Sequence, residues 1–599
     1  MDLTWIHPIW AVGLPVALAI PLGLWMTRVL DPPPEREGRG LDALATLVTR
    51  AIGRGRPTPM TWLEYGRAML AFNLALFVIT FAILWAQPRL PLNPDQKGSL
   101  AGLGYKDPAG VQHDGADTAV IFNTVCSFVT NTNLQHYSGE QHLSYFSQLG
   151  AVMWLQFVTP ACGLAVMLAV IRGLRGQRDV GDFWRDMVRS VLFVMLPLAL
   201  VTAFSLAATS VPMTFAGSAP ATTLEGGSQA IARGPVAAFV AIKQLGTNGG
   251  GFFGPNSAHP FENPTPWSNL IEVVALTLVP MASVLMFGRM LRERRHARVL
   301  FGVMLTMLLI GAGIVIAAEL RPNGAMIRPE IASGPNMEGK EVRFGPVATA
   351  TWSAATSATS NGSVNGMLDS LNPMGGLVPM ALMMINVDFS GVGSGFLNML
   401  MFVIAAVFIA GLMVGRTPEY LGRKIEAKEV KLAMVAILIH PLVITCGTAL
   451  FAATTWGSST TANPGAHGFS EILYEFTSSA ANNGSGFEGL SDNNPAWNIA
   501  TGVVLLLGRF PSLLLPLAIA GSLAVKKPTP PSLGTLPTDN FTFGMTLMGV
   551  VLLVGALSFM PAVVMGPVAD ALGKGASPAA ASAQPRVSQP LVQVLKDAH

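Results

Sequence analysis

Thr247-Asn248-Gly249-Gly250 is one of four short polar stretches that recur along a hydrophobic chain, each with an asparagine in the same place. The other three are Thr130-Asn131-Thr132-Asn133, Ser360-Asn361-Gly362-Ser363 and Asn482-Asn483-Gly484-Ser485. Aligned on Asn131, Asn248, Asn361 and Asn483, the stretches are 117, 113 and 122 residues apart. A fourfold repeat in one chain predicts four pore loops around one axis, and such loops can form a path for a dehydrated cation.

The composition places the chain in a membrane. Charged residues make up 12% of it and hydrophobic residues 51%, and the mean hydropathy is +0.49. A soluble domain carries about twice that share of charge, so the sequence predicts a polytopic membrane protein. The net charge of +3 is too small to indicate nucleic-acid binding. Three scattered cysteines without a C-x-x-C pair indicate neither a disulfide framework nor a metal site.

Ten segments are apolar over about 20 residues, the length that a spanning helix needs. They lie near 5–27, 63–86, 149–171, 188–209, 268–291, 299–318, 396–415, 432–455, 498–524 and 541–566. Arginines and lysines cluster in the connections after spans one, three, five, seven and nine, which the positive-inside rule places in the cytoplasm. Both termini and the long connections 88–148, 210–267, 319–395 and 456–497 then lie on the opposite side.

Each long connection contains one asparagine stretch, preceded by a run of apolar or small residues that is too short to span. The runs are Ala119–Val129, Val236–Leu245, Ala348–Ala358 and Ser470–Ala481, and they suit re-entrant half-helices. The predicted fold is an all-α membrane protein of ten transmembrane helices, with four repeats of helix, pore loop and helix around a pseudo-fourfold pore and one extra helix at each end. The predicted units are 1–62 (first span and cytoplasmic loop), the repeats 63–172, 185–292, 298–416 and 431–525, and 540–599 (last span and a disordered tail).

The third repeat is longer than the others. Its asparagine is followed by an apolar piece, Gly376–Ile385, and by a glycine-rich segment, Gly391–Gly395, which together predict a broken or bent helix. Asn386 and Asp388 lie in this region and could polarise an ion route. An ordinary polar position at the outer end of a bent helix fits them equally well.

Backbone carbonyls arranged in rings can replace the hydration shell of K⁺. Such loops often need φ above zero, which glycine adopts without a Cβ penalty, and Gly249, Gly250, Gly362 and Gly484 stand at the required places. Thr132 occupies that place in the first loop. The four asparagines are expected to brace the loops through side-chain hydrogen bonds, or else to line the mouth. No ring of carboxylates accompanies them, which disfavours a filter of charged side chains.

Arg509 lies in the middle of a span. A membrane-buried arginine is costly unless it faces a partner or a water-filled cavity, so we expect it to face the pore, where its charge would oppose passage straight through. Gln135, just after the first stretch, could also face the cavity. Lys243 is expected to snorkel or to brace the second loop. The histidines of the first long connection lack the spacing of helical ligands and are expected in a solvated loop; they are His113, His136 and His142.

Motifs for ATP hydrolysis are missing from the sequence. The chain has no Asp-Lys-Thr-Gly phosphorylation motif, no G-x-x-x-x-G-K-[ST] loop and no soluble stretch long enough for a nucleotide-binding domain. We therefore expect it not to hydrolyse ATP by itself and to carry no organic cofactor.

With these motifs in view, the chain resembles the A subunits of the bacterial Kdp potassium-importing ATPases. The resemblance covers nearly the whole chain and rests on runs in all four repeats: Thr130–Gln135, Leu245–Phe253, Asn256–Pro264, Thr359–Gly366, Gly415–Gly422 and Asn482–Ser485. Gly486 departs from the alanine that is frequent at that place in the family, which is a small change.

The resemblance implies the fold of the superfamily of K⁺ transporters and a K⁺ filter made of the four stretches. It implies that Arg509 and Gln135 form a barrier below the filter, and that Asn386, Asp388 and Arg416 belong to a lateral tunnel or its gate. The implied partners are a P-type ATPase B subunit, a C subunit and a small F subunit in the bacterial inner membrane. The alternative is a stand-alone channel or transporter of the Trk or Ktr kind. Inverted repeats are disfavoured because all four loops fall on one side.

Overall fold

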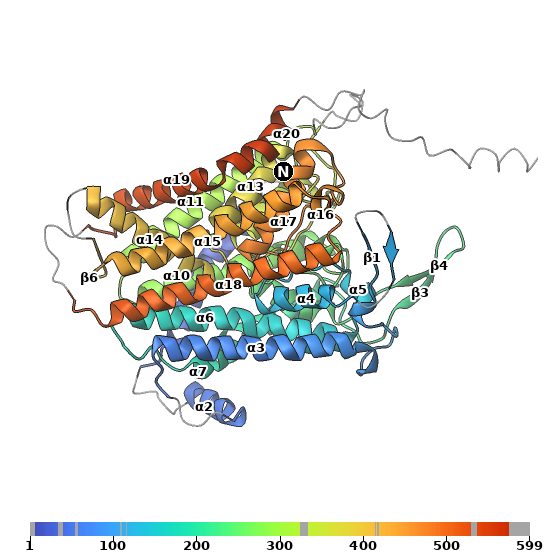
Figure 1. The fold of residues 1–599 in the computed structure, drawn as a ribbon. Coiled ribbons are helices and arrows are strands. Elements are labelled where there is room, and N and C mark those ends of the chain that lie inside the picture. The colour runs from blue at the N-terminus through green and yellow to red at the C-terminus, as the bar shows by residue number, and fades with distance from the viewer. Residues whose placement is uncertain are drawn as a thin grey trace, which may run out of the picture.

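The computed structural model describes residues 6–33, 40–53, 58–107, 111–114, 117–323, 334–413, 415, 418–528 and 536–573. Within this part of the chain, ten helical spans are long and apolar enough to cross a membrane, and they run side by side in one bundle (Figure 1). The spans are Ile6–Leu30, Trp62–Arg89, Ser147–Leu174, Phe183–Ala208, Pro266–Met290, Arg294–Glu319, Ser394–Met413, Ala427–Ala452, Pro495–Ala524 and Phe541–Leu572. The predicted ten segments are confirmed, with ends that differ by a few residues.

The helices that make up these spans are regular for most of their length. They are α1 (Ile6–Leu30), α3 (Trp62–Ala86), α6 (Trp154–Leu174), α7 (Phe183–Ser190), α8 (Leu196–Ala208), α10 (Pro266–Met290), α11 (Arg294–Glu319), α14 (Ser394–Met413), α15 (Ala427–Ala452), α18 (Pro495–Ala524), α19 (Phe541–Val563) and α20 (Ala569–Leu572). Wider π-helical turns precede α6, join α7 to α8 and join α19 to α20, at Ser147–Met153, Val191–Met195 and Val564–Val568.

Polar caps set where several spans begin. The Thr61 hydroxyl accepts a hydrogen bond from the Glu64 N–H at the start of α3, and Asn494 accepts one from the Trp497 N–H at the start of α18. Such caps satisfy donors that a helix start leaves free. The spans differ in how much of their surface is buried against the rest of the chain. In the third span 89% of the most apolar part is buried, whereas in the last span only 22% is buried. The third span therefore packs in the centre of the bundle, and the last one offers its apolar side chains to lipid.

Four shorter helices enter the bundle without crossing it: α4 (Ala119–Val129), α9 (Val236–Leu245), α12 (Gly345–Ala358) and α17 (Gly465–Ala481). Each ends where one asparagine stretch begins. The first two have the predicted bounds, whereas α12 and α17 begin earlier than predicted. Around them, α18 contacts α4, α6, α14, α15 and α17. The extra helices pack outside the repeats, α1 against α10 and α19 against α11 and α14.

The predicted break in the third repeat is present. Helix α13 (Pro373–Ile385) ends at Asn386, which has a left-handed φ of 47°, and α14 starts after Gly391 and Gly393, with φ of 74° and 81°. The N–H of Gly391 donates to the carbonyl of Thr359 at 2.7 Å. The break therefore lies directly against the third asparagine loop.

The two ends of the bundle differ. One end carries two antiparallel hairpins, at the right of Figure 1: β1 (Tyr105–Lys106) with β2 (Gln112–His113), and β3 (Ala219–Thr222) with β4 (Ser228–Ile231). The connections that carry the hairpins also contain a short helix, α5 (Gly139–His142), and 3₁₀ turns at Gln87–Arg89, Leu100–Gly102 and Asn256–Ala258. A further short helix, α16 (Thr455–Ser458), follows α15.

The opposite end carries the basic connections. A hairpin forms there from β5 (Glu419–Tyr420) and β6 (Arg423–Lys424), together with an amphipathic helix, α2 (Leu41–Ala51). Helix α2 lies within the predicted cytoplasmic loop and was not expected there; ion pairs of Asp42 with Arg185 and Arg189 hold it in place. Of the predicted tail beyond about residue 570, the part from 574 onward lies outside the described residues, as does Arg416.

Candidate ion-conduction site

The end of each re-entrant helix fixes the register of the loop that follows it. In every loop, one backbone N–H reaches back five residues to a helix carbonyl. These bonds are Thr132 N to Ser127 O (2.9 Å), Asn248 N to Lys243 O (3.0 Å), Asn361 N to Thr356 O (2.9 Å) and Asn483 N to Ser478 O (2.9 Å). Thr132 is therefore the structural counterpart of the three later asparagines, and the sequence alignment on Asn131 is wrong by one residue. Asn133, not Thr132, stands where the other loops have glycine.

The backbone alternates in handedness along each loop. We take the aligned residue of each loop (Thr132, Asn248, Asn361 or Asn483) as its reference position. The residues just before and just after this position have positive φ, whereas the reference residue between them does not. The pairs are Asn131 (66°) and Asn133 (59°), Thr247 (50°) and Gly249 (64°), Ser360 (45°) and Gly362 (85°), and Asn482 (55°) and Gly484 (95°). Alternating right- and left-handed residues turn successive N–H groups toward one side, and the carbonyls consequently face the other. A column of carbonyl oxygens requires this backbone geometry.

The four loops touch one another in chain order and close a ring. A Cβ atom added at any of three glycines would collide with a carbonyl oxygen of the next loop: Gly249 with Asn361, Gly362 with Asn483, and Gly484 with Thr132. The side-chain amide of Asn133 donates to the carbonyl of Gly249 at 3.0 Å and joins the first loop to the second. Glycine is needed where a neighbouring backbone fills the space of a side chain, whereas Asn133 uses its side chain for the bond between loops.

The asparagines are buried and brace the loops, as one of the two sequence interpretations predicted. The amide of Asn361 donates to the carbonyls of Lys243 and Gln244, both at 3.3 Å, at the end of α9. Asn483 donates in the same way to Thr356 near the end of α12, at 3.1 Å. The third and fourth loops thus each cap carbonyls of the preceding re-entrant helix. Asparagine side chains also brace the first and second loops. The amide of Asn248 donates to the side-chain oxygen of Asn131 (2.6 Å), and the amide of Asn131 donates to the carbonyls of Gly246 (3.2 Å) and Thr247 (3.1 Å).

The re-entrant helices all present the same end to the ring. The loops follow the C-termini of α4, α9, α12 and α17, so the carbonyl ends of the four helices converge on them. A helix C-terminus acts as roughly half a negative charge. Four such ends favour a cation at the ring without placing a carboxylate in it.

Side chains of the re-entrant helices hold the far side of two loops. The indole N–H of Trp352 in α12 donates to the carbonyl of Ser363 at 2.7 Å. The hydroxyl oxygens of Tyr474 in α17 and Ser485 are 2.7 Å apart. Both aromatic side chains are fully buried. The third and fourth loops are thus anchored at both ends, which limits how far the ring can widen on their side.

Arg509 lies beside the first residues of the loops, where the re-entrant helices end. This is the kind of position that the sequence predicted for a residue facing the pore. It lines a small polar cavity together with Asn131, Ser360, Asn482 and Asn386. Its guanidinium donates to the hydroxyl of Ser394 (3.0 Å) and to the carbonyl of Thr159 (3.3 Å). No carboxylate of the described residues forms an ion pair with it, so its positive charge stays uncompensated next to the ring.

Gln135 lies elsewhere. Its carbonyl oxygen accepts from the N–H of Gly251 at 2.7 Å, and its amide donates to the Gly251 carbonyl at 3.2 Å. Gly251 follows the second loop, whereas Arg509 lies where the loops begin. Gln135 therefore lies beside the last residues of the loops, and Arg509 lies beside their first residues. The expectation that the two residues form one barrier is wrong, because they are at opposite ends of the loops.

The broken helix carries two of the predicted polar residues, and one of them, Asn386, lines this cavity. The side-chain oxygen of Asn386 accepts from the Ser360 hydroxyl at 3.0 Å and also from Ser390. Asp388 is fully buried, and neither of its carboxylate oxygens has a hydrogen-bond partner within the described chain. Burying a carboxylate without hydrogen-bond partners is unfavourable, so Asp388 lowers the free energy of unfolding of the protein.

A second polar network, behind the second loop, was not predicted as such. The ammonium of Lys243 is buried, forms an ion pair with Glu262, and donates to Asn256 (2.6 Å) and Ser257 (2.8 Å). Full burial excludes the predicted snorkelling of Lys243, and its ammonium braces the segment that follows the second loop. His136 is also buried rather than solvated. The sequence signal for the Lys243 network is the density of polar residues in Asn256–Asn263, because polar side chains that become buried need hydrogen-bond partners.

These features define the class of protein: a multi-pass membrane protein whose four re-entrant helices and loops surround one axis. The family model for the potassium-transporting ATPase A subunit matches residues 9–572. Potassium-binding subunits of potassium-transporting ATPases are similar to this chain: 46% identity for Geobacillus kaustophilus (93% of this chain, 97% of the relative), 46% for Pseudomonas aeruginosa (92% and 96%) and 47% for Alicyclobacillus acidocaldarius (94% and 97%). The chain belongs to the family of potassium-transporting ATPase A subunits.

A solved structure also matches this chain. It is the potassium transporter TrkH from Vibrio parahaemolyticus, with a TM-score of 0.49 and 13% identity over 86% of this chain and 98% of that one. This likeness is too weak to support an argument about mechanism.

Proposed function

We propose that this chain selects K⁺ in the ring of four loops and passes it sideways within the membrane to a P-type ATPase partner. The filter consists of the four asparagine stretches read in the corrected register, so that Thr132, Asn248, Asn361 and Asn483 are equivalent. The observation that carries the proposal is the closed ring of loops with alternating handedness. The family assignment independently supports K⁺ as the transported ion.

Selectivity for K⁺ rests on carbonyl oxygens that replace water around the ion. The ring supports this role because neighbouring loops are tied by amide-to-carbonyl bonds and anchored by buried side chains. The converging helix C-termini make the ring attractive to a cation. A monovalent ion held by dipoles rather than by carboxylates can also leave again, which transport requires.

Arg509 and the broken helix together support a sideways route. A fixed positive charge next to the ring opposes the passage of K⁺ straight through the bundle. Asn386, Ser360 and Ser390 offer oxygen atoms beside the same cavity, on the side where α13 and α14 are interrupted. The ion therefore leaves the ring past Asn386 and Asp388, and Arg509 acts as the barrier in the straight direction. Arg416 remains a candidate for the gate.

The partners follow from family membership and from what the sequence lacks. The similar proteins are named as potassium-binding subunits of a potassium-transporting ATPase, and this chain has no motif for ATP hydrolysis. A P-type ATPase B subunit therefore supplies the energy, with a C subunit and a small F subunit completing the complex. The basic end of the bundle faces the cytoplasm of a bacterial inner membrane, and both termini lie on the periplasmic side.

Replacing Arg509 tests the direction of the route. Arg509→Gln removes the charge, so the complex should gain a passive K⁺ leak that does not need ATP, measured as ⁸⁶Rb⁺ flux into proteoliposomes without nucleotide. Arg50→Gln, at an exposed arginine of α2, serves as the control and should not leak. An unchanged or reduced leak in Arg509→Gln would favour a stand-alone transporter of the Trk or Ktr kind.

A further inference from the structure

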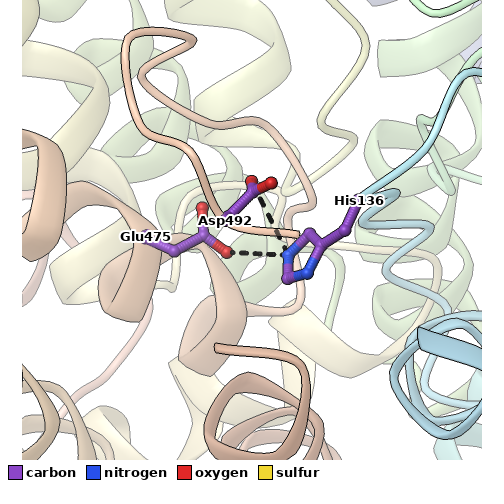
Figure 2. Close-up of side chains that lie close together, drawn as sticks. All are labelled: His136, Glu475 and Asp492. Atoms are coloured by element: carbon purple, nitrogen blue, oxygen red, sulfur yellow. Dashed lines mark ion pairs between the residues drawn. The ribbon is translucent and has the colours of Figure 1, made fainter. Parts of the chain in front are cut away.

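Three ionisable side chains from distant parts of the chain meet outside the ring (Figure 2). His136 follows the first loop, Glu475 lies in α17, and Asp492 lies between the fourth loop and α18. The Nε2 atom of His136 is 3.6 Å from Oε1 of Glu475 and 3.7 Å from Oδ2 of Asp492. The side chains of His136 and Glu475 are 0% and 1% exposed, whereas that of Asp492 is 27% exposed. The cluster is thus buried on all sides but one.

Two of the facing atoms have no hydrogen-bond partner within the described chain: Nε2 of His136 and Oε1 of Glu475. Their separation exceeds the roughly 2.7–2.9 Å of a charge-assisted hydrogen bond. Buried polar atoms without a partner are rare in folded proteins, and each one calls for a specific explanation such as a bound ion.

The ring of His136 is held in the tautomer that suits a metal ligand. Its Nδ1 atom is 2.8 Å from Oδ1 of Asn498, whose amide nitrogen faces the side-chain oxygen of Asn493 at 3.3 Å. Because the Asn498 oxygen accepts, Nδ1 carries a proton, and Nε2, once deprotonated, directs its lone pair toward the side on which the two carboxylates lie. Metal-ligating histidines are typically oriented in this way by a hydrogen bond from their other ring nitrogen.

Charge and distance agree with a divalent cation. Within the described residues, His136 is the one ion-pair partner of either carboxylate, so with a neutral ring the cluster carries two negative charges. A divalent ion neutralises both, whereas a proton on the ring leaves one uncompensated. Ligands at about 2.0–2.2 Å from a tetrahedral centre lie about 3.4 Å apart, close to the 3.6 and 3.7 Å observed here.

We propose that His136, Glu475 and Asp492 bind a divalent transition-metal cation of the Zn²⁺ type. Nε2, Oε1 and Oδ2 are the three protein ligands, and the partly exposed side at Asp492 admits the ion and a water molecule as the fourth ligand. The ion ties the segment after the first loop to α17 and to the segment after the fourth loop. None of the three ligand residues belongs to the four asparagine stretches, so the site is separate from the carbonyls proposed to bind K⁺.

Zn²⁺ binding to the purified complex tests the site. After chelator treatment, equilibrium dialysis should show that the unaltered complex binds one Zn²⁺ ion at this site. The Glu475→Gln and His136→Gln complexes should each bind this ion with an affinity at least about 100-fold lower. Asn498→Ala should weaken binding by about 10- to 100-fold, because it removes the group that orients the ring. His142→Gln is the matched control: this half-buried histidine bonds to the backbone oxygen of Ser138 at 2.9 Å and forms no ion pair within the described residues. It should bind Zn²⁺ as the unaltered complex does.

Asp492→Asn keeps the test decisive if a buried variant fails to fold, because its side chain is partly exposed. A folded Asp492→Asn complex should also bind Zn²⁺ at least about tenfold more weakly. The proposal is overturned if the unaltered complex retains no Zn²⁺, or if Asp492→Asn and His142→Gln bind it equally well. Because Zn²⁺ is measured directly, failure here leaves the proposed K⁺ filter untouched.

Discussion

The ring of loops predicts a large effect from a single added methyl group. Gly362 has a φ of 85°, and a Cβ atom there would collide with the carbonyl oxygen of Asn483 and lie 3.1 Å from the N–H nitrogen of Ser485. Gly362→Ala therefore costs about 1–2 kcal/mol for the left-handed backbone. It also pushes the fourth loop away by a distance on the order of 1 Å. Binding constellations tolerate about 0.5 Å, so the carbonyl ring loses its fit to K⁺.

The hairpin turn between β3 and β4 offers a control that isolates the second effect. Gly226 has a φ of 83°, and no atom lies within 4 Å of a Cβ built there. Gly226→Ala thus carries the same backbone strain without touching a loop. We expect Gly362→Ala to raise the KM for K⁺ at least about tenfold, equivalent to about 1.4 kcal/mol, and to reduce discrimination against NH₄⁺. Gly226→Ala should change neither.

The assay is K⁺-stimulated ATP hydrolysis by the purified complex, repeated with Rb⁺ and NH₄⁺. The amount of intact complex, measured by size-exclusion chromatography, separates a folding defect from a filter defect. Equal KM values and equal ion selectivity in the two variants would refute the carbonyl ring as the selective element.

Three further perturbations probe the loops and their surroundings. Asn361→Ala removes two donors to the end of α9 and should cost about 1–2 kcal/mol, seen as a lower Tm with weaker K⁺ affinity; an unchanged Tm would contradict the bracing role. Asp388→Asn should leave the Tm equal or higher, because both oxygens are buried and unpartnered, while transport falls; unaltered transport would exclude Asp388 from the route. The pKa of His467 is lowered by burial but raised by hydrogen bonds to Asp369 (3.0 Å) and Asp570 (2.8 Å), to about 10 in all. Because this pKa lies above its ordinary value of 6.5, the stabilisation is complete below about pH 6.5 and is lost toward pH 10. The Tm difference between the unaltered complex and His467→Gln should therefore be largest near pH 6 and vanish above pH 10, and a difference that grows with pH would contradict it.

The fold was largely predictable because its signals are local. Spanning length, basic connections and short apolar runs before the asparagines each depend on a few neighbouring residues, and they located the ten spans and the four re-entrant helices. The glycines in the segment Gly391–Gly395 likewise predicted the broken helix. The early starts of α12 and α17 were missed because Gly345 and Gly465 begin them with residues that seldom favour helix.

The site was less predictable because its details depend on contacts between loops. Asn131 and Asn133 both fit the repeated pattern, and the five-residue-back bond that selects Thr132 as the reference position is visible only in the folded backbone. Gln135 follows the first loop so closely that its separation from Arg509 could not be read from spacing. His136 meets Glu475 only because the first and fourth loops adjoin in the ring, so no local pattern could reveal that it is buried.

The position of the bound ion decides whether the four loops form the K⁺ filter. Crystals or grids of the complex prepared with Rb⁺ in place of K⁺ should show an ion on the axis enclosed by the four loops, coordinated by backbone carbonyls around Thr132, Asn248, Asn361 and Asn483; anomalous scattering identifies Rb⁺ in the crystal case. An ion held instead by side-chain carboxylates away from the ring, with nothing bound between the loops, would contradict the account.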